Sequence, residues 1–303
     1  MLEFKKLTKE SFEDIRVYFD YEAERQKRHS VRISDKTPGA VLLWFREYDV
    51  EYAIAGDCVV FYSNIGEGRK SYYYPIGNNK RAALKLLAEH IRETGGCAMI
   101  AAIGEGTLGK VSREMFIAEA FASRDTADYI YIKSEFENPT GRKHHKRKNL
   151  INRFKSEYGD AHIEIINEDN ISRVKEYYND YCLRNPESSS TDNMEFRTVN
   201  ALLDDFDYRY FIGGMLVADG KILGFTISQV YGDTVYVHIE KAEKDIPGAY
   251  QTLNKEFLLH ITDPEVRYVN REEDMGLPGL RRSKMSYCPA WLEYKYMLKV
   301  SVE

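Results

Sequence analysis

The sequence predicts an α+β layered fold made of two units of similar size, and three observations lead to this prediction. The chain has 303 residues, which corresponds to about two domains. Strand patterns joined by short turns and amphipathic helix patterns occur in both halves. The segment Asn138-Pro139-Thr140-Gly141 interrupts these patterns, and we therefore expect domains at 1–140 and 141–303.

The elements of the first half follow from local patterns. Ser11 and Asp14 have the spacing of a capping box at the start of a helix. A turn at Gly56 separates two strand patterns, and Gly95 ends a helical one. The expected elements are a helix at 11–24, strands at 49–54, 58–63 and 72–76, a helix at 80–94, and strands at 97–103, 116–123 and 128–132.

The pattern restarts after residue 141 with a long helix. The expected elements of this half are helices at 142–158, 170–184, 193–204 and 249–261, and strands at 161–166, 208–217, 221–231, 233–241 and 291–300. Hairpin-linked strands mixed with helices are typical of an α+β layered fold. No sequence repeat relates the two halves.

Composition excludes several classes of protein. Hydrophobic residues make up 43% and charged residues 30%, which is typical of a globular chain. The net charge of −5 provides no global attraction for nucleic acid, so any basic site must be local. No stretch approaches the roughly 20 apolar residues of a membrane span, and no signal pattern opens the chain. The four cysteines lack a C-x-x-C spacing and the seven histidines an H-x-x-x-H spacing, so we expect reduced thiols, no metal and a cytoplasmic location.

A glycine loop from Gly104 to Lys110 matches both G-x-G-x-x-G and G-x-x-x-x-G-K after a predicted strand. Val111 stands where a P-loop needs Ser or Thr to hold Mg²⁺. Too few residues separate Gly109 from the next strand for the helix of at least about ten residues that a dinucleotide fold needs. We therefore favour a turn before a short helix, and nucleotide binding through Gly104 to Lys110 is the less favoured alternative.

A run of cations without acids lies at 142–155. On a helix, one face would carry Arg142, Lys146, Asn149 and Arg153, and Arg147 lies between them in sequence. Cations in the first turn of a helix are unfavourable beside the positive end of the macrodipole, whereas the N–H groups there bind anions. The run predicts either an anion site or a solvated face that acids from other segments neutralise.

Three further patterns in the second half offer ligand groups. The strand at 234–241 alternates, which places His238 and Glu240 on one face and predicts a cavity wall or a water-facing surface. Gly248 then leads into a helix whose N–H groups can bind a phosphate or a carbonyl oxygen. The carboxylates of 272–274 are followed within ten residues by three cations, which suits an ion-pair network or a zwitterionic substrate.

Three parts of the chain together resemble one family. They are Asp128-Tyr-Ile-Tyr131 with the basic run, His238-Ile-Glu-Lys-Ala242 with Gly248-Ala-Tyr-Gln-Thr-Leu-Asn254, and Asn270-Arg-Glu-Glu-Asp-Met-Gly276 with Gly279-Leu-Arg-Arg-Ser-Lys-Met-Ser-Tyr287. The chain resembles the soluble family related to the C-terminal domain of bacterial phosphatidylglycerol lysyltransferases. This resemblance implies two tandem GNAT-like acyltransferase domains of the acyl-CoA N-acyltransferase type, each a mixed, mostly antiparallel sheet flanked by helices, with the active site in the second.

The resemblance also implies an activity, the transfer of an acyl or aminoacyl group to an amine or hydroxyl acceptor. The donor would be a coenzyme A thioester or an aminoacyl-tRNA. The partners would be an anionic small molecule or a tRNA acceptor end, with a lipid head group as a further candidate. The stretch 244–249 departs from the R/Q-x-x-G-x-G/A loop that binds the pyrophosphate of coenzyme A in GNAT proteins.

Under this resemblance Glu240 is the candidate general base, with Glu273 and Asp274 as alternatives, and Tyr287 would protonate the leaving group. The residues expected to bind the donor or substrate are His238, Gly248, Tyr250, Gln251, Asn254, Asn270, Arg271, Arg281, Lys284, Arg142, Lys146, Arg147, Asn149 and Arg153. The alternative is a non-catalytic protein on the same fold that binds an anionic ligand with the same cations.

Overall fold

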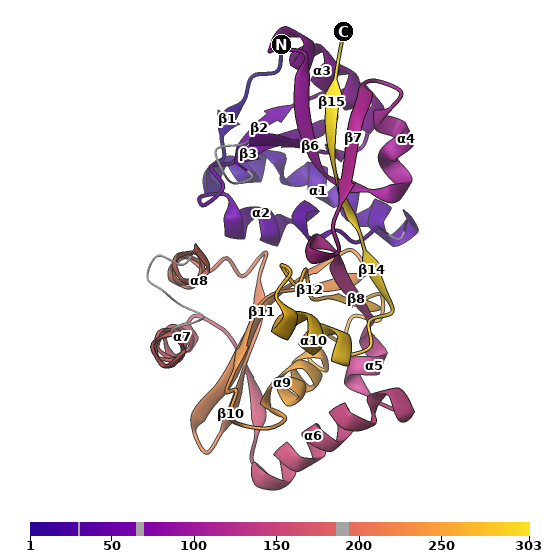
Figure 1. Ribbon diagram of the computed structural model, residues 1–303. Helices are drawn as coiled ribbons and strands as arrows, with labels where there is room; N and C mark the ends of the chain where they lie inside the picture. The colour runs from indigo at the N-terminus through magenta and orange to yellow at the C-terminus, as the bar shows by residue number, and fades with distance from the viewer. Residues whose placement is uncertain (30, 65–69, 186–193) are drawn as a thin grey trace. The chain divides into compact units, whose positions relative to one another are not determined.

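The computed structural model describes residues 1–29, 31–64, 70–185 and 194–303 (Figure 1). The chain forms two compact units. Unit 1 comprises Met1–Asp128, Glu273–Leu277 and Leu292–Glu303, and unit 2 comprises Tyr129–Glu272 and Pro278–Trp291. The units therefore differ from the contiguous division expected at 140/141, because the chain returns to unit 1 twice after leaving it.

Unit 1 is built on an eight-stranded sheet with the order β1-β2-β3-β4-β6-β15-β7, in which β5 pairs with β3. The strands are β1 (Lys5–Lys6), β2 (Glu51–Ile54), β3 (Cys58–Asn64), β4 (Lys70–Tyr73), β5 (Ile76–Gly77), β6 (Cys97–Gly104), β7 (Phe116–Ala122) and β15 (Lys295–Ser301). β15 is hydrogen-bonded to β6 on one side and to β7 on the other. This pairing explains the second return of the chain, because the last strand completes the first sheet.

Helices cover both faces of this sheet. They are α1 (Lys9–His29), α2 (Pro38–Trp44), α3 (Lys80–Glu93) and α4 (Leu108–Val111), with short 3-10 turns at Ser34–Lys36, Glu105–Thr107 and Arg124–Thr126. Val60 belongs to the core under α3, whereas the ring of the next residue, Phe61, lies 6.1 Å from that of Phe19 on α1. Neighbouring strand residues point to opposite faces, so α1 and α3 lie on opposite sides.

Unit 2 is built on a seven-stranded sheet with the order β14-β8-β13-β12-β11-β10-β9. The strands are β8 (Asp128–Ile132), β9 (His162–Ile165), β10 (Ile212–Ala218), β11 (Lys221–Tyr231), β12 (Thr234–Ala242), β13 (Tyr268–Asn270) and β14 (Trp291–Glu293). The helices are α5 (Lys133–Glu137), α6 (His145–Glu157), α7 (Ile171–Arg184), α8 (Met194–Asp204), α9 (Ala249–Leu258) and α10 (Pro278–Ser286), with a 3-10 turn at Arg142–His144. α7 and α8 lie on one face of the sheet, and α9 with α6 on the other (Figure 1).

The predicted elements correspond closely to these, including the hairpin of β2 and β3 and the helix α3. Five short elements, β1, α2, α5, β13 and α10, were not predicted. The single strand expected at 291–300 is divided between β14 and β15, which belong to different sheets. The start of α2 carries a readable signal, because Thr37 accepts a hydrogen bond from the Ala40 N–H and Pro38 is the first helical residue. The expected helix at 193–204 is α8, and its first residue, Asn193, lies outside the described residues. None of the described helices is both long and apolar enough to span a membrane.

Candidate functional site in unit 2

The parallel strands β12 and β13 pair over only three residues, from Thr234 opposite Tyr268 to Tyr236 opposite Asn270. Beyond this point, side chains connect the two segments. Arg271 donates a hydrogen bond of 2.6 Å to Glu240 Oε1. The next residue, Glu272, places Oε1 2.8 Å from His238 Nδ1. The structure thus brings together predicted site residues from two distant parts of the sequence.

A bulge in β12 changes the predicted alternation of this strand. Ile239 pairs with Ile227 and Val237 with Ser228, so His238 has no partner of its own in the ladder. Bulges of this kind redirect side chains and recur beside active sites. Residues 234–239 are all buried, which excludes the water-facing alternative for this strand. The ring of His238 is fully buried, and its Nε2 has no hydrogen-bond partner among the described residues.

Two buried arginines flank the ring of Tyr287. The guanidinium of Arg271 lies 4.5 Å from the ring centroid, and that of Arg147 lies 5.4 Å from it. Arg147 also lies 4.8 Å from the ring of Phe136, which stacks on Tyr287. We call Glu240, Arg271, Tyr287 and Arg147 the Arg271 cluster. Arg147 was expected to bind the donor as part of the basic run, and the structure buries it, because its position on α6 faces the aromatic rings.

The guanidinium groups of this cluster have more donors than the described residues satisfy. Arg271 uses Nη2 for Glu240, whereas its buried Nη1 has no partner in the described part of the chain. Arg147 donates from Nη2 to the Glu135 carbonyl, and its buried Nε and Nη1 have no described partner. A buried N–H without an acceptor is unfavourable, so these groups suit an anionic or carbonyl oxygen of a ligand.

Burial and charge set the protonation of the cluster. Burial raises the pKa of Tyr287 to about 12, with Arg271 opposing the rise and Glu240 adding to it. Burial alone would lower the pKa of Arg271, but Glu240 and Tyr287 raise it above its ordinary value. At neutral pH the cluster therefore presents a phenol that can donate a proton and a permanent cation.

Neighbouring residues fix the position of Arg271. The ammonium of the buried Lys284 donates to the Arg271 carbonyl, and the Tyr131 hydroxyl donates to the Lys284 carbonyl at 2.8 Å. Lys284 was expected to hold a phosphate, but its ammonium is used within the fold. Asn270 accepts a hydrogen bond of 2.7 Å from the N–H of Glu272, whose φ is +55°. Such a backbone conformation is unfavourable for glutamate, and the chain holds it beside this site.

The two alternative bases belong to the other unit. Glu273 and Asp274 belong to unit 1, whereas Glu240 belongs to unit 2. Glu273, Asp35 and Asp128 surround the ammonium of Lys295, which lies 2.8 Å from Asp35 and 3.0 Å from Asp128. Burial raises the pKa of Glu273 to about 7, with Lys295 opposing the rise and the two other carboxylates adding to it. The cation that these three carboxylates hold is therefore a side chain of the protein.

The basic run divides into separate environments. Arg142 lies in the 3-10 turn before α6 and not in the α-helix as expected, because α6 begins at His145. Lys146, Asn149 and Arg153 are exposed, and Arg153 pairs with Glu157 at 2.9 Å. The charge of the run is therefore partly neutralised on the surface.

The start of α9 is packed against other helices. Gly248 has φ +92°, and a Cβ there would lie 2.3 Å from the Leu150 carbonyl oxygen of α6, so the chain requires glycine at this position. The Tyr250 hydroxyl lies 3.4 Å from that of Tyr181, and Asn254 donates to the Tyr250 carbonyl. Gln251, which follows Tyr250, is half-buried, and Arg281 on α10 is half-exposed.

The glycine loop lacks the structure that both nucleotide motifs require. β6 ends at Gly104, and a 3-10 turn and the four-residue helix α4 follow.

Glu272 is the residue of the candidate site that sequence reasoning did not select. Its approach to His238 depends on the pairing of β12 with β13, which no local pattern shows.

Comparison with known proteins places the chain among transferase-related sequences. A family profile described as "Phosphatidylglycerol lysyltransferase, C-terminal" matches residues 27–299. The chain is similar to an uncharacterized protein of Mycoplasmoides gallisepticum, with 24% identity over 179 residues. That match covers 58% of this chain and 56% of that protein, so it spans little more than half of the relative's length.

Two solved structures show the same architecture. A conserved protein of unknown function from Bacteroides thetaiotaomicron VPI-5482 has 30% identity and a TM-score of 0.86, over 99% of this chain and 100% of that one. L-PGS from Bacillus licheniformis has 13% identity and a TM-score of 0.68, over 97% of this chain and 92% of that one. The predicted α+β fold of two units, each with a mixed sheet flanked by helices, is confirmed.

Proposed function

The chain belongs to the family of phosphatidylglycerol lysyltransferase C-terminal domains, and from this premise we propose that it transfers an acyl or aminoacyl group at the Arg271 cluster. The donor would be an aminoacyl-tRNA or a coenzyme A thioester, and the acceptor an amine or hydroxyl. The observation that carries the proposal is the pair of buried arginines, of which Arg271 Nη1 and Arg147 Nε and Nη1 lack acceptors in the described protein. Fold alone does not imply this chemistry, so the proposal rests on the site.

The cluster suits the charge that develops during acyl transfer. When the acceptor attacks the donor carbonyl, its oxygen becomes negative, and buried N–H groups stabilise that charge strongly. Arg271 and Arg147 present such groups beside Tyr287. Their fixed charge also suits a donor whose leaving group is anionic.

Two groups can take the proton that the acceptor loses. Glu240 uses Oε1 for Arg271, and its other oxygen makes no hydrogen bond with the described residues. His238 is the second, because Glu272 orients its ring through Nδ1 and Nε2 remains without a described partner. The Tyr287 hydroxyl would return a proton to the departing oxygen or sulfur, so the transfer begins and ends with neutral acceptor and leaving group.

A transfer assay with single substitutions tests the proposal. Purified protein would be incubated with labelled aminoacyl-tRNA or acyl-CoA and a mixture of amines and hydroxyl compounds, and labelled product would be measured. Tyr287→Phe and Glu240→Gln keep the shape of the site, and we expect the substitution at the working base to lower kcat by about 100-fold or more. His238→Gln decides between the two candidate bases.

Binding measurements separate the transferase from a non-catalytic binding protein. In a transferase, Glu240→Gln and Tyr287→Phe should bind the donor with nearly unchanged Kd and lose turnover. Arg271→Lys should weaken donor binding in either case, because lysine cannot replace the planar guanidinium. Donor binding without any transfer by the native protein would favour the binding protein. Affinity for tRNA should fall as salt rises.

A further inference from the structure

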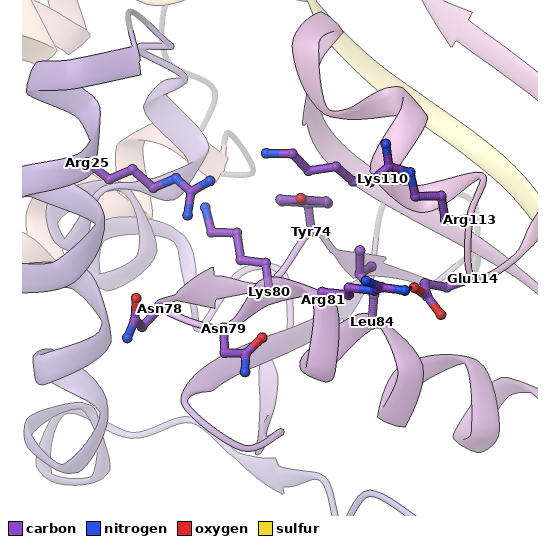
Figure 2. Close-up of a pocket in the computed structure, with 10 residues that line it drawn as sticks. All are labelled: Arg25, Tyr74, Asn78, Asn79, Lys80, Arg81, Leu84, Lys110, Arg113 and Glu114. Atoms are coloured by element: carbon purple, nitrogen blue, oxygen red, sulfur yellow. Dashed lines mark hydrogen bonds and ion pairs between the residues drawn. The ribbon is translucent and has the colours of Figure 1, made fainter.

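A second site of a different kind lies in unit 1. A cavity of about 260 Å³ opens between α1, α3 and the segment that contains α4 (Figure 2). Its charged lining is formed by Arg25, Lys80, Arg81, Lys110, Arg113 and Glu114. Five cations and one carboxylate therefore face a single cavity in a protein whose net charge is negative.

Among the described residues, two of these cations are paired. Lys80 donates to Glu22 at 2.7 Å, and Arg81 donates to Glu114 at 3.2 Å. Arg25, Lys110 and Arg113 make no ion pair with any residue that the structure describes. In Figure 2 the charged ends of Arg25, Lys80 and Lys110 point to the same space beside the hydroxyl of Tyr74.

Tyr74 supplies an independent sign that this space takes a ligand. Its side chain is 1% exposed and lines the cavity, and its hydroxyl has no hydrogen-bond partner in the described protein. A buried hydroxyl without a partner is unusual, because its desolvation is not compensated. The amines of Lys36 and Lys80 lie 4.7 and 5.4 Å from the centroid of its ring.

The positive charge here is partly buried, which makes an anion favourable. Lys36 and Lys80 are each 7% exposed, and Glu22 pairs with Lys80. Burial and the neighbouring Lys80 lower the pKa of Lys36 to about 7. Burial lowers the pKa of Lys80 as well, with Glu22 opposing this effect and Arg25 adding to it. An anion in the cavity would offset the repulsion between these buried cations and would favour their charged forms.

The backbone at the start of α3 is positive, like the side chains that line the cavity. Lys80 and Arg81 are the first residues of α3, where the macrodipole is positive and where cations are unfavourable without an anion. Asn79 satisfies the Ala82 N–H, and the other N–H groups of this turn face the same end of the helix.

We propose that this cavity binds a small phosphate-bearing ligand, such as a diphosphate or a phosphate ester, between Arg25, Lys80 and Lys110. Its volume is slightly below the roughly 300–1,000 Å³ of pockets for drug-sized ligands, which fits a compact anion better than a dinucleotide. Lys110, which the glycine motif selected, would bind through its ammonium and not as part of a P-loop. All residues of this cavity belong to unit 1, whereas those of the Arg271 cluster belong to unit 2.

Calorimetric titration of the full chain with inorganic pyrophosphate at low ionic strength tests the site. We expect saturable binding that falls by about tenfold or more in Arg25→Ala and in Lys110→Ala, since each removes a charged hydrogen-bond donor. Both side chains are at least partly exposed, so these variants should fold. Lys85→Ala is the matched control, because Lys85 is an exposed lysine of α3 outside the cavity.

Tyr74→Phe adds a readout that general charge effects cannot imitate. It removes only the hydroxyl, and we expect pyrophosphate affinity to fall about three- to tenfold without loss of stability in the free protein. Equal affinity in the native protein, Arg25→Ala and Lys110→Ala would overturn the proposal, as would the absence of saturable binding. Binding of tRNA that Lys110→Ala weakens, with no binding of pyrophosphate, would also overturn it and indicate an RNA surface.

Discussion

Replacing Glu240 with alanine should destabilise unit 2 by about 3–5 kcal/mol, the usual cost of removing one partner from a buried ion pair. The side chains of Arg271 and Glu240 are 8% and 9% exposed, so solvent screens the pair little. Without Glu240, the guanidinium of Arg271 would remain buried on the ring of Tyr287 with no described carboxylate partner. Glu240→Gln should cost less, because the amide oxygen can still accept the hydrogen bond from Arg271.

The two tryptophans allow the units to be followed separately. Trp44 lies in unit 1 and Trp291 in unit 2. Urea unfolding would be followed by tryptophan fluorescence in a Trp44→Phe background, which reports unit 2, and in a Trp291→Phe background, which reports unit 1. We expect Glu240→Ala to lower the free energy of unfolding reported by Trp291. The free energy of unfolding of unit 1, reported by Trp44, should stay unchanged.

A matched control uses an exposed pair of the same unit. Arg153 and Glu157 are 60% and 44% exposed, so Glu157→Ala should change the free energy of unfolding by less than about 0.5 kcal/mol. If Glu240→Ala is no more destabilising than Glu157→Ala, the pair with Arg271 is not a desolvated ion pair. The account of the Arg271 cluster would then be refuted.

Three further predictions concern other parts of the chain. The folded pKa of Glu273 is raised above its unfolded value, so its contribution to the stability of unit 1 should be present below about pH 4.5 and be lost as pH rises through about 7; the difference between native protein and Glu273→Gln in the Trp291→Phe background should follow this course, and a difference independent of pH would contradict it. Gly248→Ala should destabilise unit 2 by more than about 1 kcal/mol, because φ is +92° and the new methyl would meet the Leu150 carbonyl oxygen at 2.3 Å; an unchanged midpoint of urea unfolding would show that α9 and α6 can separate. Tyr74→Phe should leave the free protein equally or slightly more stable, since the lost hydroxyl has no described partner; a loss above about 1 kcal/mol in thermal unfolding would mean that the hydroxyl is bonded.

The sequence predicted most of the fold because its signals are local. α3 combines a helical period with glycines directly after it, and β2 and β3 enclose a turn at Gly56. The boundary between the units was not predictable in this way. β15 hydrogen-bonds with β6 and β7, and the residues of β15 carry no local sign of which sheet they join.

The candidate site shows the same division. The sequence selected Glu240, Arg271 and Tyr287 individually, from a polar strand face and a charged segment. It selected Arg147 only as one cation of the basic run, because helical period alone cannot show which side of α6 meets Phe136 and Tyr287. The pairing of Glu272 with His238 also could not be foreseen, since the bulge at His238 exists only in the register with β11.

By itself, the sequence determined the class of fold, the main helices and strands and the family. The fold class and the elements depend on the period of apolar residues and on capping and turn residues within short segments, whereas the family was identified from the resemblance of three longer segments. Only the tertiary structure decided that the last strand completes the first sheet, that Arg271 meets Glu240, and that Lys110 shares a cavity with Lys80. Such contacts depend on which distant segments lie side by side, and free energy is minimised over the whole chain and not within each segment.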